Sequence, residues 1–191
     1  EAFTFIYDAN IRLLEAMGAK LVYFSPLHDQ YLADVDALWL PGGYPELHAE
    51  GLAKNTNMLE QIKQFFIQDK PVLAECGGFL YCLQTLTDLE GQQYPMAGLL
   101  AGHGAMRGRS GCQGMQVASL PEGEVRAHSH HRSRSEQTPE PISHGIRQRH
   151  PAPGEAIYRQ RQLTASYLHL FFPSNANAVA QLFRPSLKAT P

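Results

Sequence analysis

The sequence shows no strong excess of charge, no long apolar run and few cysteines. Its 16 Lys and Arg against 18 Asp and Glu give a formal net charge of −2, which provides no electrostatic reason to expect nucleic acid or a membrane surface as a partner. No apolar stretch approaches the roughly 20 residues that cross a bilayer. The three cysteines are too few and too irregularly spaced for a disulfide framework, and they fit a reducing, cytoplasmic location.

The composition is that of one globular domain. The chain has 191 residues, of which 43% are hydrophobic, enough for the core of a single domain of about 100–200 residues. It starts at Glu1, with neither Met nor the basic-then-apolar pattern of a signal peptide. We therefore expect it to be part of a longer protein.

Helix-like and strand-like segments alternate in the first part of the chain. Apolar residues recur at helical spacing in residues 8–19 and 57–68, whereas short apolar runs ended by Pro or Gly predict buried strands. We expect such strands at residues 21–24, 37–40 and 72–74. This alternation predicts an α/β fold in which helices cover both faces of a mostly parallel sheet.

The later part of the chain has a different pattern. Further strands are predicted at residues 115–119, 124–128, 156–158 and 163–167. Residues 132–153 are rich in Ser, Arg, His and Pro, a composition that predicts a long exposed loop. Ser174 is placed to cap a last helix that ends near Phe183, because Ser is a preferred N-cap residue.

The segment most informative about function is Pro-Val-Leu-Ala-Glu-Cys-Gly-Gly-Phe-Leu at residues 71–80. A buried strand that meets Cys76, followed by two glycines and a helix, is typical of a nucleophile elbow. A helix that begins at the cysteine also favours its thiolate form. The other interpretation of Cys76 is a buried structural cysteine, and the local pattern leaves both open.

A cysteine nucleophile needs groups that activate it and stabilise charge. Gly42 and Gly43 end the strand expected at 37–40, where backbone N–H groups could face a developing oxyanion. His169 follows the strand expected at 163–167, so it would reach the same sheet edge if that strand is parallel to the others. His128, His130 and His131 form a second histidine group, which no zinc motif accompanies.

Four ordered motifs resemble one known family. They are Phe-Ser-Pro-Leu at 24–27, Leu-Pro-Gly-Gly-Tyr-Pro-Glu-Leu at 40–47, Ala-Glu-Cys-Gly-Gly at 74–78 and Ser-Tyr-Leu-His-Leu at 166–170. Together they resemble the glutamine amidotransferase domain of the cobyrinate a,c-diamide synthases, which are corrin-modifying amidoligases of cobalamin biosynthesis. The resemblance covers nearly the whole chain.

The resemblance implies a class I amidotransferase fold, a three-layer α/β/α sandwich over residues 1–191. It implies that Cys76 is the nucleophile, that His169 raises its reactivity, and that Gly43 and Gly77 supply the N–H groups of an oxyanion hole. The glutaminase would release ammonia from glutamine for the a- and c-acetate carboxylates of a corrin. An amino-terminal synthetase domain, outside this chain, would bind ATP and Mg²⁺.

The sequence departs from the family pattern at several points. Many class I amidotransferases carry a Glu two residues after the histidine, whereas Phe171 stands here. The family's Arg-Gly-His-Glu-Phe-His segment is altered to Arg-Ala-His-Ser-His-His at residues 126–131. The chain has no Gly-Lys pair and hence no Walker A loop, so we expect no nucleotide cofactor in this domain. We expect no metal either, because no zinc motif accompanies the histidines.

Several alternatives stay open from the sequence. The chain could resemble the cobyric acid synthases instead, although Glu75 and the Tyr-Pro-Glu after Gly43 favour the diamide synthases. It could be another cysteine-dependent hydrolase of the same fold, or a binding domain without catalysis. The histidines at 128, 130 and 131 could also bind cobalt or another metal ion.

Overall fold

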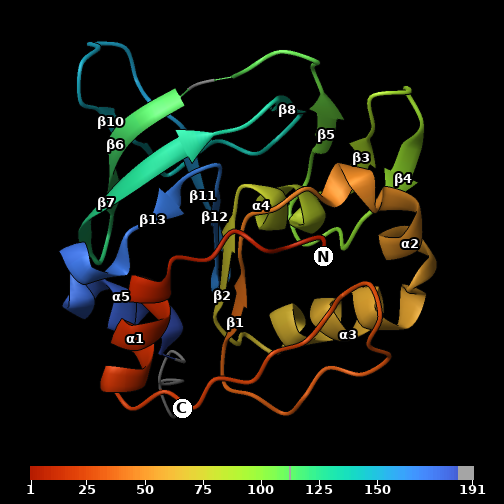
Figure 1. Cartoon of the computed structure of the whole chain (residues 1–191), viewed down its shortest axis with the longest axis horizontal. Coiled ribbons are helices and arrows are strands. Elements are labelled where there is room, and N and C mark those ends of the chain that lie inside the picture. The colour runs from red at the N-terminus through yellow and green to blue at the C-terminus, as the bar shows by residue number, and fades with distance from the viewer. Residues whose placement is uncertain (112, 185–191) are drawn as a thin grey trace.

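A computed structural model describes residues 1–111 and 113–184, with helices packed around a five-stranded sheet (Figure 1). The helices, including two short 3₁₀ turns labelled η, are α1 (Asp8–Ala16), η1 (Pro45–Leu47), α2 (Ala49–Lys54), α3 (Thr56–Ile67), α4 (Gly77–Cys82), η2 (Phe172–Ser174) and α5 (Ala176–Phe183). The predicted helices at 8–19 and 57–68 are therefore present as α1, which ends three residues earlier than expected, and as α3, which is displaced by one residue.

The central sheet is mixed rather than mostly parallel. Its strands, in spatial order, are β1 (Leu38–Leu40), β2 (Val72–Glu75), β12 (Leu163–Ser166), β11 (Ala156–Gln160) and β9 (Ser143–His144). β1, β2 and β12 are parallel, whereas β11 and β9 run antiparallel to their neighbours. The expectation of a mostly parallel sheet fails at β11. Only Arg161 and Gln162 connect β11 to β12, whereas a parallel pair needs a crossover of a dozen or more residues.

Helices lie on both faces of this sheet, as the α/β prediction required (Figure 1). Side chains alternate along β2: Val72 and Ala74 belong to the core cluster that includes α3 and α4, whereas Leu73 belongs to the cluster that includes α5. Since successive side chains of a strand point to opposite faces, one short strand contributes to both cores. All four residues of β2 are buried.

Two smaller sheets complete the fold. One contains β10 (Ile146–Arg147), β6 (Gln113–Leu120), β7 (Gly123–His130) and β13 (His169–Leu170), and the other contains β4 (Gln93–Pro95), β3 (Thr85–Thr87), β5 (His103–Met106) and β8 (Ser133–Glu136). The hairpin of β6 and β7 includes the two strands predicted at 115–119 and 124–128. In the first of these sheets every pairing is antiparallel.

Three local predictions are wrong. Residues 21–24 form no strand. The supposed exposed loop at 132–153 contains β8, β9 and β10, and Ser133 within it is buried. The last helix is capped by Asn175, whose side chain accepts from the Ala178 N–H, while Ser174 accepts from the Arg126 N–H instead.

Beside β1 lies a cavity of about 640 Å³. Its walls are mainly apolar and come from β1, α1 and residues 18–24 and 32–37. β1 is the edge strand of the central sheet in the part of the chain that the structure describes. The apolar run at 21–24 therefore lines an open space, and among the described residues no strand lies between it and β1 to give it hydrogen-bonding partners.

Candidate active site

Cys76 occupies a sharp turn between β2 and α4. Its backbone has φ +47° and ψ −103°, a conformation that residues other than glycine rarely adopt. Its N–H donates to the Ser166 carbonyl oxygen at the end of β12, at 2.8 Å. The turn expected of a nucleophile elbow is thus present, and tertiary contacts hold it in a strained conformation.

The thiol of Cys76 is buried, with 6% of the residue exposed. Burial raises the pKa of Cys76 to about 12; the N–H of Gly77 opposes this shift, and the carboxyl groups of Glu46, Glu155 and Glu75 add to it. The start of α4 therefore acts in the expected direction, through the Gly77 N–H, but burial has the larger effect on the pKa of Cys76. Sγ donates to the His130 carbonyl oxygen at 3.8 Å, so the resting group is a hydrogen-bonded thiol.

The glycines that follow β1 lie directly against the elbow. A Cβ built on Gly77 would lie 2.9 Å from the backbone nitrogen of Gly43, and one on Gly43 would lie 2.1 Å from the carbonyl oxygen of Ala2. A Cβ on Gly42 would lie 2.2 Å from Cε1 of His169. The backbones of Gly43 and Gly77 therefore adjoin each other, and Gly42 is in contact with the histidine.

His169 lies on β13, which pairs with β7, and not on an extension of β12. Its ring is packed between Gly42 and Phe5, whose ring centroid is 4.4 Å away. Burial, and to a smaller extent His128, His130 and His131, lower the pKa of His169 to about 4. A neutral imidazole is able to accept a proton at neutral pH, as a general base must.

One backbone hydrogen bond and one bond from a backbone N–H to a side-chain carboxylate bring Cys76 and His169 to the same edge of the central sheet. The Cys76 N–H bonds the Ser166 oxygen, and the Leu170 N–H donates to Oε1 of Glu75 at 2.8 Å. Residues next to the cysteine and the histidine are therefore joined directly, although the two lie 93 residues apart in sequence (169 − 76). Among the described residues, buried Nδ1 of His169 has no hydrogen-bond partner, so no carboxylate bonds this nitrogen.

The histidines at the end of β7 divide into two groups. His128 and His130 are stacked 6.2 Å apart, and His128 lies 6.0 Å from His169. His131 instead has both ring nitrogens occupied, by the Ser133 carbonyl oxygen and by Oε1 of Glu155 at 2.8 Å. No sequence pattern pointed to Glu155, because 24 residues separate it from His131.

The ring of His131 also stacks on Tyr167, at 3.7 Å between centroids.

Within the described ranges there is no group of three or more His, Cys, Asp or Glu side chains arranged to hold a metal ion. Over the same ranges, no helix has the length and apolarity needed to cross a membrane.

Residues 1–177 match the family of CobB/CobQ-like glutamine amidotransferase domains. The chain belongs to this amidotransferase family. It is 46% identical to the hydrogenobyrinate a,c-diamide synthase of Stutzerimonas stutzeri over 184 residues, 96% of this chain and 43% of that protein. It is 40% identical to the cobyrinate a,c-diamide synthase of Herminiimonas arsenicoxydans over 189 residues, 98% of this chain and 43% of that protein.

The CobB/CobQ-like chain therefore spans less than half the length of these curated relatives. A solved structure confirms the class I amidotransferase-like fold. This crystal structure of a glutamine amidotransferase matches with a TM-score of 0.64 over 91% of this chain and 90% of that one, at 16% identity. At so low an identity the likeness concerns the fold alone, and it agrees with a central sheet that carries helices on both faces.

Proposed function

We propose that this CobB/CobQ-like domain is the glutaminase of a cobyrinate a,c-diamide synthase, with Cys76 as nucleophile and His169 as base. The observation that supports this most is the strained elbow at Cys76, joined through Ser166 and Glu75 to the segment that holds His169. The similarity to the hydrogenobyrinate and cobyrinate synthases extends over almost the whole chain, so the activity of those enzymes is the best guide to the acceptor.

The protonation states of the resting site define the first chemical step. Both groups are neutral at pH 7, because burial holds the pKa of Cys76 at about 12 and that of His169 at about 4. Proton transfer from the thiol to His169 therefore accompanies attack of Sγ on the carboxamide carbon of glutamine. The S–C bond forms as the carbonyl electron pair moves to oxygen, which gives an oxyanion beside an imidazolium.

The adjoining backbones of Gly43 and Gly77 are placed to donate N–H hydrogen bonds to that oxyanion. One such donor typically changes the rate by about 10²–10³. Collapse of the intermediate breaks the C–N bond, and His169 returns its proton to the departing ammonia. Water, deprotonated by His169, then hydrolyses the thioester, which yields glutamate and restores the thiol.

The released ammonia would amidate the a- and c-acetate carboxylates of a corrin in a synthetase domain outside this chain. ATP and Mg²⁺ would be bound by that domain. The chain has no Gly-Lys pair, and the described residues offer no cluster of metal ligands. The free thiol that the glutaminase needs fits a reducing, cytoplasmic location.

Labelling with 6-diazo-5-oxo-norleucine, an electrophilic glutamine analogue, tests this function. Intact-mass and peptide mass spectrometry should find one adduct, at Cys76, and Cys76→Ala should lose both the adduct and glutamine hydrolysis. Cys82→Ala is the matched control, since Cys82 lies in the core with no exposed surface and should not be labelled. Glutamine hydrolysis that survives in Cys76→Ala would disprove the assignment, and a folded, unlabelled wild type would indicate a binding domain.

A further inference from the structure

Glu75 is the most deeply buried carboxyl group near the candidate site, and the reaction proposed above does not use it. It is 2% exposed and directly precedes Cys76. Its two oxygens each accept one hydrogen bond at 2.8 Å, Oε1 from the Leu170 N–H and Oε2 from Nε1–H of Trp39. Burying a carboxyl group is costly unless it is hydrogen-bonded, so this arrangement requires an explanation.

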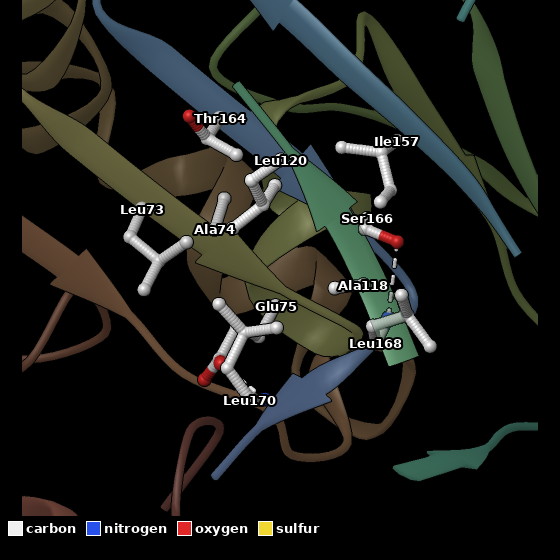
Figure 2. Close-up of a pocket in the computed structure, with 10 residues that line it drawn as sticks. All are labelled: Leu73, Ala74, Glu75, Ala118, Leu120, Ile157, Thr164, Ser166, Leu168 and Leu170. Carbon is white, nitrogen blue, oxygen red and sulfur yellow. Dashed lines mark hydrogen bonds between the residues drawn. The ribbon is translucent and has the colours of Figure 1, made fainter. Parts of the chain in front are cut away.

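Glu75 does not face a ligand site. It borders a cavity of only about 10 Å³ between β2, β12, β13 and β6, walled otherwise by apolar side chains and the polar Thr164 and Ser166 (Figure 2). Such a space holds at most about one water molecule. Within this wall, Glu75 and Leu170 lie side by side (Figure 2). The partners of the carboxylate are therefore the protein's own N–H groups.

The bond to Leu170 is part of a clamp on the segment that holds His169. The Leu170 N–H donates to Glu75, and the Leu170 carbonyl oxygen accepts from Nδ2 of Asn10, which is 1% exposed. Oδ1 of Asn10 accepts in turn from the Phe172 N–H. Two buried side chains, from β2 and α1, thus fix the backbone immediately after His169.

The ring of His169 is placed by packing. Its Nδ1 is buried without a hydrogen-bond partner among the residues that the structure describes, and the ring lies against Gly42, Phe5 and His128. Where the ring is placed by packing, its position depends on where the backbone of residue 169 stands. That backbone is fixed relative to Cys76 through Glu75, whose own main chain continues directly into the cysteine.

We propose that Glu75 is the positioning residue of this site: it sets the place of His169 relative to Cys76 through the backbone of Leu170. This inference rests on the proposed glutaminase function. Glu75 would do through a main-chain N–H what a carboxylate bonded to the histidine ring does elsewhere, and the geometry needs no residue two positions after His169. Misplacement of a catalytic group by about 1 Å can cost about 10²-fold in rate.

The two donors around Glu75 allow a specific test by substitution. Glu75→Gln replaces one acceptor oxygen by an NH₂ group. This NH₂ group must face either the Leu170 N–H or the indole N–H, so one of the two hydrogen bonds is replaced by two donors that face each other. Trp39→Phe removes the indole donor. In the double variant the glutamine oxygen is free to accept from Leu170 while its NH₂ group faces no donor.

We expect Glu75→Gln to lower kcat for glutamine hydrolysis by about 10–100-fold with KM changed less than about twofold. The imidazole Cε1–H resonance of His169 should shift in the NMR spectrum of the same variant. Adding Trp39→Phe should restore kcat to within about threefold of the Trp39→Phe single variant. Glu122→Gln, which alters a carboxylate paired with Arg159 in another part of the fold, is the matched control and should leave kcat unchanged.

A wild-type kcat and His169 resonance in Glu75→Gln, with only a lower melting temperature, would overturn the proposal and make Glu75 a structural residue. A double variant as slow as Glu75→Gln would overturn it too. If Glu75→Gln does not fold, the double variant is compared with Trp39→Phe instead: it keeps the Leu170 bond, so a kcat more than about threefold lower or a displaced His169 resonance would overturn the proposal. If wild type hydrolyses no glutamine and Cys76 is not labelled, the proposed function fails, yet the His169 resonance still tests Glu75 without turnover.

Discussion

β1 borders two regions that are packed in opposite ways. Toward β2 and the elbow, backbone atoms approach so closely that a Cβ on Gly78 would lie 2.0 Å from the Leu40 carbonyl oxygen. Away from β2 lies the cavity of about 640 Å³, where Gly18 has nothing within 4 Å of a built Cβ and Tyr23 is 71% exposed. The difference shows that conformational precision in this fold is concentrated on the side that holds Cys76 and His169.

The two regions also differ in how their polar groups are satisfied. Around the elbow, the buried side chains of Glu75 and Asn10 bond specific main-chain atoms of Leu170 and Phe172. The walls of the cavity are mostly apolar. A buried hydrogen-bonded network specifies one geometry, because a shift leaves polar groups without partners; an apolar wall imposes no such condition.

The largest effect is expected for an added methyl group on the closed side. Gly78→Ala would place Cβ 2.0 Å from the Leu40 oxygen and 2.9 Å from its Cβ, and neither the strand nor the helix start can move without disturbing the elbow. We expect a loss of about 3 kcal/mol or more in the free energy of unfolding, measured by urea denaturation.

Gly18→Ala is the matched substitution on the open side. Space is available there, and only the positive φ of +89° opposes an alanine, which costs roughly 1–2 kcal/mol. Equal destabilisation by the two alanines would mean that the close packing beside Leu40 does not restrict the elbow.

A pH effect of intermediate size is expected from His169. Its pKa is about 4 in the folded chain, against an ordinary value of 6.5, so between these values the unfolded chain binds a proton that the folded chain does not. The contribution of His169 to the free energy of unfolding therefore rises with pH across this window. Glu75 acts oppositely: its pKa is raised by burial from 4.5 to about 7, so its contribution falls as pH rises from about 4.5 to 7.

Because the contributions of His169 and Glu75 oppose each other, together they would change the free energy of unfolding of the wild type little with pH. The difference between wild type and His169→Asn isolates the histidine. This difference in unfolding free energy should grow by up to about 3 kcal/mol between pH 4 and 6.5 and stay constant above pH 7, which is the internal control. A difference that is flat across the whole range would show that His169 is not buried as a neutral ring.

The comparison also explains what the sequence could predict. The turn at Cys76 was accessible because strand, cysteine and two glycines are contiguous, so local pattern determines it. The hydrogen bonds of Glu75 could not be predicted, since its partners Trp39 and Leu170 are 36 and 95 residues away in sequence. Nothing in the local sequence distinguishes Glu75 from any other carboxylate at a strand end. The link between His131 and Glu155 was missed for the same reason.

The strand expected at residues 21–24 failed for a different reason. The apolar run is real, but a strand forms only where a neighbour accepts and donates its hydrogen bonds. No strand lies between this run and β1 in the described part of the chain, where the cavity stands instead. The roles of Cys76, His169, Gly43 and Gly77 remain predictions that labelling and kinetics must test.

The smallest effect is expected on the open side itself. Tyr23 is largely exposed and lines the cavity, and the hydrogen bonds that hold the elbow are made by other residues. Tyr23→Ser should therefore change the free energy of unfolding by less than about 0.5 kcal/mol and leave Cys76 labelling unchanged. Phe79→Ser, the same kind of change at a residue with no exposed surface in the core beside the elbow, should be strongly destabilising. If Tyr23→Ser destabilised the chain by several kcal/mol, the wall of the cavity would be a determinant of the fold, and the contrast between the two sides of β1 would not hold.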